Sequence, residues 1–214
     1  TTARFFAKVV GVFLKSSDGI LIVGASPFSR LVGRYLKQNN RRVVLLDSNA
    51  SHVERAKNAG LEALEADIFQ DEVDDNIELS DIGYLLAFTG SAMVNDHAIT
   101  KFSEQFGEKG SFRLISEDEM NGVKEMPKEG ILSHTDDFLN LSEVVRDYPT
   151  INEVTVSSNE QYQEVLKMLY ENKLTVPLFV KDNTNFIHVI SSEMNLKIEE
   201  GNTLMYVGKP LEMN

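Results

Sequence analysis

The sequence predicts an α/β protein in which a doubly wound parallel sheet is followed by a smaller C-terminal α+β domain. From residue 19 to residue 116, short apolar runs alternate with segments of helical periodicity. This alternation is typical of parallel strands joined by helical crossovers. The pattern breaks down between Glu117 and Tyr148, where the chain is polar and rich in turn residues. Strand-like runs resume after Pro149, which we interpret as a domain boundary.

The first strand is predicted at "ILIVG" (residues 20–24), a run typical of a buried strand. Apolar residues then recur at helical spacing and predict a helix: Phe28, Leu31, Val32, Tyr35 and Leu36. Ser26 suits the N-cap of this helix, and Pro27 suits its first turn.

Four more strands are predicted in this half of the chain: "RVVLLD" ending at Asp47, "LEALEAD" ending at Asp67, "GYLLAFTG" (83–90) and "SFRLIS" (111–116). The segments between them predict helices. "SHVE" (51–54) reads as a capping box that opens a helix ending at Gly60. An acidic helical segment follows over residues 70–79, and a longer helix over residues 92–106.

The C-terminal part predicts a small α+β unit. Four runs in it are expected to be strands: "INEVTVS", "VPLFVKD", "FIHVIS" and "NTLMYVG". "SSNE" (157–160) is expected to cap a helix, and "LNLSEVVRDYP" (139–149) predicts a short helix before the boundary. We therefore divide the chain into a tether (1–19), a doubly wound α/β domain (20–148) and a C-terminal domain (149–214).

Composition narrows the possible functions. The 214 residues include no cysteine, which excludes disulfides, thiolate catalysis and cysteine-ligated metals. The net charge of −12 argues against nucleic acid as a partner. Residues 1–57 carry a net charge of +7 and the remainder −19, which fits either solvated faces or a basic end near an anionic membrane surface. The chain does not begin with Met, and we interpret it as a piece of a longer protein.

The turn after the first strand is the first candidate binding element. A strand, a glycine turn and a helix N-terminus together suit a phosphate, because the helix start offers unpaired N–H groups. Of the usual G-x-G-x-x-G pattern, only Gly24 remains, with serines at the second and third positions. The candidate residues of this turn are Gly24, Ala25, Ser26, Phe28, Ser29 and Arg30. A strand-to-helix turn that binds no ligand is the alternative.

Three further strand ends carry polar side chains. Asp47 with Ser48 ends the second strand, Asp67 with Ile68 the third, and Thr89 with Gly90 the fourth. A carboxylate at the position of Asp47 can accept hydrogen bonds from ribose hydroxyls, or can instead cap the next helix. Because the carboxyl ends of parallel strands meet at one edge, we expect these side chains to converge on one nucleotide-binding crevice.

Metal and catalytic sites are not expected. The four histidines have no zinc-like spacing to one another: His52, His97, His134 and His188. No residue stands out as an acid or base for catalysis.

Four segments together resemble the TrkA N-terminal domain, also called the regulator of potassium conductance (RCK) domain: "ILIVGAS", "LVGRYL", "RVVLLDSNASHVERAKNAGLEALEADIF" and "LLAFTGSAMVN". Five residues match the pattern of that family: Gly24, Asp47, Asp67, Thr89 and Asn95. Three residues depart from it: Ser26, Ser29 and Ala66. The resemblance implies a Rossmann-like domain that binds NAD(H), AMP, ADP or ATP.

Two other segments resemble the proteins in which such domains occur. "FIHVISSEMNLKIEEGNTLMYVGKP" resembles the end of the companion TrkA C-terminal domain, with Asn202 in place of the usual Asp. "TTARFFAKVVGV" resembles the tail that follows the last transmembrane helix of bacterial cation:proton antiporters. These resemblances imply a cytosolic regulatory portion of a Na⁺/H⁺ or K⁺/H⁺ antiporter, at the cytoplasmic face of the bacterial inner membrane. Its partners would be a second copy and the transmembrane antiporter domain of the same polypeptide.

Three functions therefore stay open. The first is a non-catalytic nucleotide sensor that controls ion transport through the packing of a dimer. The second is an NAD-dependent oxidoreductase, against which the lack of an acid, a base and a substrate domain argues. The third is a structural dimerisation module whose turn binds nothing.

Overall fold

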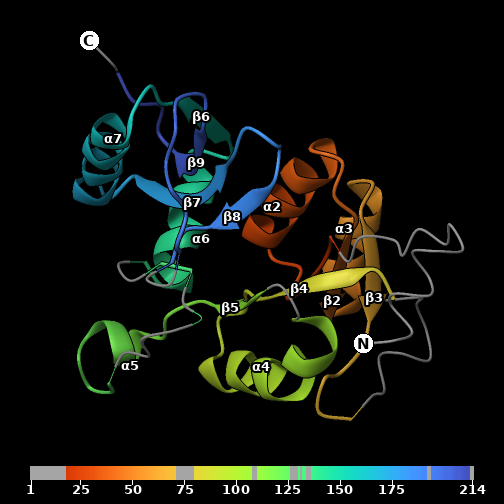
Figure 1. Cartoon of the computed structure of the whole chain (residues 1–214). Helices are drawn as coiled ribbons and strands as arrows, with labels where there is room; N and C mark the ends of the chain where they lie inside the picture. Colours follow the sequence, from red (N-terminus) through yellow and green to blue (C-terminus); the bar gives the residue numbers. More distant parts are fainter. Residues whose placement is uncertain are drawn as a thin grey trace, which may run out of the picture.

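The computed structural model describes residues 18–70, 80–107, 110–125, 130, 132–133, 136–191 and 194–212. Most of the tether and nearly all of the acidic helix expected over residues 70–79 lie outside the described residues. The described chain forms two sheets with helices packed on them (Figure 1). None of the described helices combines the length and apolar character needed to cross a membrane.

The first sheet has five strands: β1 (Gly19–Val23), β2 (Val43–Asp47), β3 (Glu62–Glu65), β4 (Ile82–Ala87) and β5 (Gly110–Arg113). All of its pairings are parallel, in the order β3-β2-β1-β4-β5. The strand order reverses at β1, which is entirely buried between β2 and β4. The predicted fold class, a Rossmann-like doubly wound sheet, is thereby confirmed.

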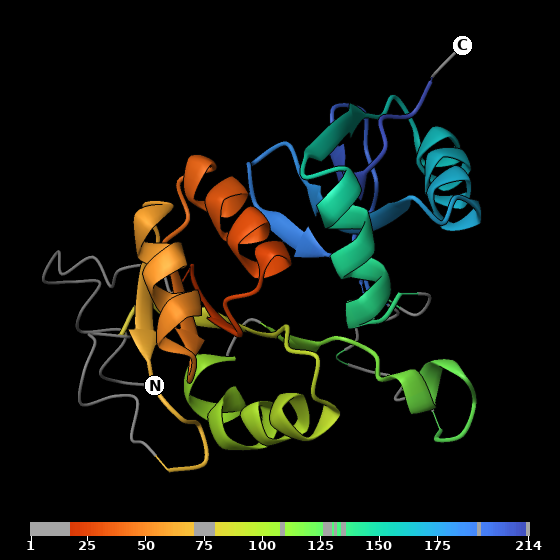
Figure 2. The same cartoon turned by 180° about the vertical axis from the view of Figure 1, so that it is seen from behind.

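Helices cover both faces of this sheet (Figures 1 and 2). Helices α2 (Pro27–Gln38) and α3 (Ala50–Asn58) lie on one face, and α4 (Ala92–Phe106) lies on the other. The alternation of side chains along β1 explains this arrangement. Ile20 and Ile22 join the core under α2 and α3, whereas Leu21 and Val23 face Phe102 of α4.

Several predicted boundaries differ from the structure by one to three residues. Asn49, not Ser51, caps α3, because the Asn49 side chain accepts from the backbone N–H of Ser51 and His52. Ser158, not Ser157, caps α7 (Asn159–Glu171) in the same way. The sequence indicated Ser51 and Ser157 instead, because each is followed three positions later by a glutamate, which is the pattern of a capping box. The expected N-cap of α2 at Ser26 and the expected start of α4 at residue 92 are confirmed.

The second sheet is antiparallel and forms the smaller unit. Its strands are β6 (Ile151–Thr155), β7 (Thr175–Lys181), β8 (Ile187–Val189) and β9 (Thr203–Gly208). They lie in the order β6-β9-β7-β8. Along β9, Leu204 and Tyr206 face a cluster shared with α7, whereas Met205 and Val207 join the core of the first unit.

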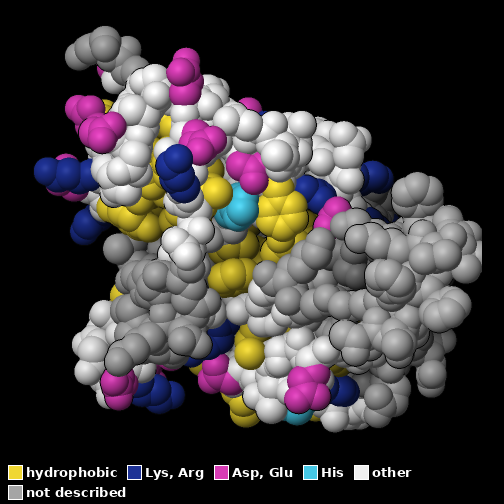
Figure 3. Space-filling model, in the orientation of Figure 1, with side chains coloured by type: hydrophobic (Ala, Val, Ile, Leu, Met, Phe, Trp, Pro, Cys, Tyr) yellow, Lys and Arg dark blue, Asp and Glu magenta, His cyan; other side chains and the backbone are white. Residues whose placement is uncertain are grey.

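One hydrophobic cluster therefore joins the two sheets. Helix α6 (Phe138–Asp147) contacts both α2 and β9, and its residues Leu141, Val144 and Val145 enter this cluster. Polar contacts reinforce the junction: the Tyr35 hydroxyl of α2 contacts Glu153 of β6 and Met205 of β9. Hydrophobic side chains also gather in a hollow between the two sheets (Figure 3).

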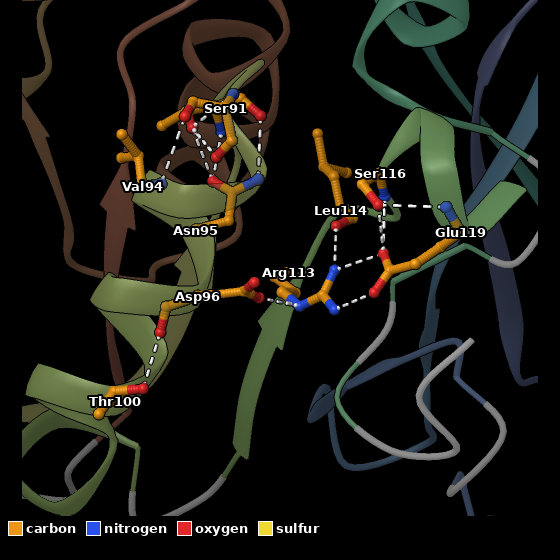
Figure 4. Close-up of polar contacts among 10 residues, drawn as sticks. Ser91, Val94, Asn95, Asp96, Thr100, Arg113, Leu114, Ser116 and Glu119 are labelled. Carbon is orange, nitrogen blue, oxygen red and sulfur yellow. Dashed lines mark hydrogen bonds and ion pairs between the residues drawn. The ribbon is translucent and has the colours of Figure 1, made fainter. Parts of the chain in front are cut away.

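The short helix α5 (Glu117–Met120) lies away from both sheets and is held to β5 by Arg113 (Figures 1 and 4). The buried Arg113 guanidinium donates two hydrogen bonds to the Glu119 carboxylate, at 2.9 and 2.6 Å, and pairs with Asp96 of α4 at 2.8 Å. Ser116 completes a capping box with Glu119. The guanidinium holds the pKa of Glu119 at about 2, well below its usual value of 4.5.

We expect Leu36→Ala to destabilise both sheets together. Leu36 is fully buried in the shared cluster, so the substitution should cost about 2–5 kcal/mol of unfolding free energy. Leu139→Ala, at a position that is 62% exposed, should change it by less than about 0.5 kcal/mol. Urea unfolding followed by circular dichroism and by tyrosine fluorescence measures both variants. Equal losses in the two variants would contradict the burial of Leu36, and separate transitions for the two probes would contradict a shared core.

Glu119→Gln should destabilise the protein in a pH-dependent way. At pH 7 we expect a loss of about 1.5–3 kcal/mol, the usual worth of a hydrogen bond to a charged group. Because the folded pKa is depressed, the wild-type contribution is complete above pH 4.5 and is lost as the pH falls towards 2. The difference between the two proteins should therefore shrink over that range. Glu117→Gln, on the exposed side of the same helix, is the control, and a constant difference from pH 7 to pH 3 would refute the ion pair.

Candidate functional site

A cavity of about 250 Å³ lies at the carboxyl ends of β1, β2, β3 and β4. Eight of the twelve predicted site residues line it: Gly24, Ser26, Asp47, Ser48, Asp67, Ile68, Thr89 and Gly90. The other four, Ala25, Phe28, Ser29 and Arg30, do not line it. The expected convergence of four strand ends on one crevice is thus present in the structure.

The β1 turn needs its glycine. Gly24 has a φ of +102°, a backbone conformation that residues with a side chain rarely adopt. A Cβ added there would also lie 3.0 Å from the Phe88 carbonyl oxygen and 3.0 Å from Thr89 Cγ2. The glycine therefore allows the turn to pack directly against the end of β4, which brings the first and fourth strand ends into one site.

The turn uses most of its own hydrogen-bond donors. The backbone N–H of Ala25 donates to Asp47 Oδ2 at 2.7 Å, and that of Ser29 donates to Ser26 Oγ at 3.1 Å. Pro27 has no N–H. Within the described residues, the amides of Ser26 and Phe28 are the donors at this helix start that keep no partner. The turn therefore offers a phosphate fewer donors than a glycine-rich turn does.

The four candidates that do not line the cavity have side chains directed towards the rest of the protein. Phe28 packs on Phe88 in the core, with 5.2 Å between ring centroids, and Ser29 is fully buried with its hydroxyl 3.0 Å from that of Ser26. Arg30 folds back and donates from Nη1 to the Ala25 carbonyl at 2.5 Å. Burial, and then the nearby Arg55 and Arg34, lower the pKa of Arg30.

Asp47 connects the first two strand ends. Besides the Ala25 amide, its carboxylate accepts from the Asn49 amide at 2.9 Å and lies 3.2 Å from His52 Nδ1. Asp47 therefore takes part in the helix capping that was the alternative role, and it also lines the cavity. Sequence reasoning missed His52, although its position five residues after Asp47, within the first turn of α3, is a usable signal.

The third strand end is a turn organised by Asp67. Its carboxylate accepts from the Phe69 amide at 2.9 Å and from Gln70 Nε2 at 3.0 Å. Ile68 is buried against the cavity, and its carbonyl accepts from Lys101 Nζ at 2.8 Å. Phe69 also lines the cavity and stacks on His97, with ring centroids 4.5 Å apart.

The fourth strand end is fixed by Asn95, which is buried at the start of α4 (Figure 4). Asn95 Oδ1 accepts from the backbone N–H of Thr89 at 3.0 Å and from its hydroxyl at 2.8 Å. Asn95 Nδ2 in turn donates to the Thr89 carbonyl at 3.0 Å. Thr89 and Asn95 therefore act as one rigid unit, which explains their joint occurrence in the motif.

Phe138 is a wall of the cavity that the sequence did not indicate. It is the first residue of α6, about fifty positions beyond β4, and lines the cavity beside Gly90. A Cβ on Gly90 would lie only 3.0 Å from Phe138 Cδ1. Only the tertiary fold brings these two residues together, so no local pattern reports the contact.

The charges of the site are acidic. Among the described residues, the lining includes two carboxylates, Asp47 and Asp67, and no lysine or arginine. No group of three or more metal-ligating side chains is present in the described ranges. The arrangement can accept hydrogen bonds from hydroxyl and amino groups, and Ile68 and Val94 add apolar surface to the lining.

Among the comparisons with known proteins, only the match to a family model is informative, and the others are not. No curated protein matches the chain. A TehB-like SAM-dependent methyltransferase from Corynebacterium glutamicum is 10% identical over 95% of this chain and 86% of its own, with a TM-score of 0.35. N5-carboxyaminoimidazole synthetase from Staphylococcus aureus, complexed with ADP, is 12% identical over 94% of this chain and 49% of its own, with a TM-score of 0.31. At these TM-scores, neither likeness informs on fold or ligand.

A family model, in contrast, matches residues 20–126 and is that of the TrkA-N domain. The matched range includes all five strands of the parallel sheet and every cavity residue except Phe138. TrkA-N domains are nucleotide-binding, Rossmann-like regulatory domains of K⁺ transport systems, and they generally bind NAD(H). Because the match spans half of the chain, this protein belongs to the TrkA-N domain family.

Proposed function

We propose that this chain is the cytosolic, non-catalytic nucleotide-sensing part of a monovalent cation:proton antiporter. The observation that carries the proposal is the cavity at four strand ends, lined by Asp47, Asp67 and Thr89. Ligands of open α/β sheets bind outside the carboxyl ends of the strands, where the strand order reverses. The cavity lies at that place in a chain of the TrkA-N family.

Each polar group has a role in holding a nucleotide. The carboxylate of Asp47 can accept from ribose hydroxyls, and the free amides of Ser26 and Phe28 can donate to a phosphate at the start of α2. We assign no catalysis, because Asp47, Asp67 and Thr89 already make hydrogen bonds that shape the site. Binding, rather than proton transfer, is the function that these contacts favour.

The proposed regulation acts through two copies of the chain. The residues before β1 would connect the chain to a transmembrane antiporter domain at the cytoplasmic face of the bacterial inner membrane. Residues 149–214 would serve as the TrkA-C-like companion domain. A nucleotide changes transport only if it binds one dimer packing more tightly than the other. The transported ion is Na⁺ or K⁺ in this proposal.

We expect an adenine nucleotide to raise the melting temperature and Asp47→Ala to abolish the rise. At 100 times its dissociation constant, a ligand adds about 2.7 kcal/mol of stability. The panel is NAD⁺, NADH, ATP, ADP and AMP. Glu65→Ala is a matched control, because Glu65 is paired with Asp47 on the next strand, is exposed and does not line the cavity.

The outcomes separate the three functions. A shift that persists in Glu65→Ala and disappears in Asp47→Ala supports the sensor. No shift with any nucleotide would leave a structural dimerisation module. Oxidation of an alcohol or a 2-hydroxy acid by NAD⁺ in the presence of the protein would instead support an oxidoreductase.

A further inference from the structure

We propose that residues 1–17 of this chain add a strand to the outer edge of β8, in a groove at the junction of the two sheets. This surface is separate from the strand-end cavity, so docking there does not depend on nucleotide binding. Three features of the molecule carry the proposal: the outer edge of β8, the apolar groove along that edge, and the place where the chain enters the fold.

The outer edge of β8 can accept one more strand. Among the described strands, β8 is the last of its sheet and pairs with β7 alone. The amide of Asp182 donates to the Phe186 carbonyl at 3.0 Å, and the amide of Ile190 donates across the same ladder at 3.0 Å. Because hydrogen-bonded and non-hydrogen-bonded pairs alternate in an antiparallel ladder, the peptide groups of Ile187 and Val189 point away from β7. They are placed to pair with an added strand.

An open groove of about 580 Å³ follows this edge (Figure 3). One side of the groove comes from the parallel sheet, with Tyr84 of β4 and Phe112 of β5, which are only partly buried. The other side comes from β8 and the residues next to it, including Phe186, Val189 and Met194. A row of peptide groups beside an apolar floor suits an extended apolar segment, which gains main-chain hydrogen bonds and buries alternate side chains.

The chain enters the fold beside this groove. Asp18, the first described residue, lines a small apolar pocket together with Tyr84 and Val189, which both also line the groove. Asp18 pairs with Arg41 at 3.1 Å, and Arg41 in turn donates to the Asn185 carbonyl, in the turn before β8, at 3.1 Å. Residues 1–17 are therefore joined to the fold near the start of β8. At about 3.3 Å per extended residue, they are long enough to follow this edge.

The composition of residues 1–17 fits a strand in this place. Residues 9–14 read "VVGVFL", in which valine and phenylalanine favour strands and glycine disfavours a helix. Residues 1–17 carry three basic side chains and no acidic one, whereas residues 151–214 carry nine acidic and five basic ones. The segment and the unit that contains β8 thus have opposite net charges, which favours their association.

The entry point also sets the direction of the added strand. The segment ends near the turn before β8, and β8 runs away from that turn, from Ile187 to Val189. Earlier residues of the segment would lie beside later residues of β8. The added strand would therefore be antiparallel to β8.

Disulfide trapping in the 214-residue chain tests the proposal, because the sequence has no cysteine of its own. Ser191→Cys, in the groove, is combined in turn with Val9→Cys, Val10→Cys, Gly11→Cys and Val12→Cys. We expect a disulfide within one chain whose yield alternates by at least about threefold from one position to the next, since side chains of a strand alternate between two faces. Ser157→Cys, at an exposed position before α7, is the control and should trap none of the four.

Hydrogen exchange of the same chain reports the backbone pairing. The amides of residues 9–14, and those of Ile187 and Val189, should exchange at least about tenfold more slowly in the wild type than in Phe13→Asp. Phe13→Leu keeps an apolar side chain and should keep the protection. Position 13 lies outside the described residues, so both sheets should stay folded in both variants, which circular dichroism checks.

The outcomes decide between the possible occupants of the groove. A disulfide that joins two chains would assign the groove to a second copy and overturn the proposal. Protection of residues 9–14 with no change at β8 in Phe13→Asp would mean that the segment binds elsewhere or does not pair as a strand. Fast exchange of residues 9–14 in the wild type would show that the segment does not dock. Each of these results leaves nucleotide sensing to be judged by its own melting experiment.

Discussion

The burial of helix α2 between two sheets is the constraint on which the rest of the structure depends. Its N-terminus forms the turn after β1, its buried residues pack on the parallel sheet, and Tyr35 reaches the antiparallel sheet. A helix with apolar partners on two sides cannot shift without opening both contacts. The turn that faces the cavity and the surface that joins the second unit are therefore parts of one rigid element.

The parallel sheet could be predicted because its signals are local. Buried runs such as β1 and the strand end at Asp47 follow from spacing alone, and so does the capping of α2 by Ser26. The start of α3 could not be predicted to the residue, because Asn49 and Ser51 are both good caps and their competition is settled by the Asp47 carboxylate.

The residues of the site could be predicted where they lie at strand ends. Gly24, Asp47 and Thr89 stand at strand ends, and strand ends converge by the geometry of a parallel sheet. Sequence spacing placed Phe28 on the apolar face of the helix, which is the face that the structure buries, but it did not show that Ser29 is also buried. Phe138 could not be predicted for a different reason: its contact with Gly90 is long-range and depends on how α6 packs.

The bridge between Ile115 and Asp137 closes a chain excursion at its base. The chain leaves the sheet just after β5 and returns at nearly the same point to begin α6, while Arg113 holds α5 near the exit. The entropy of closing such a loop rises only slowly with its length. Gly130 and Leu132 hydrogen-bond to Arg113 of β5 on the way back, so the natural insertion point is the exposed stretch at residues 121–125, where relatives can gain residues without disturbing the sheet or α6.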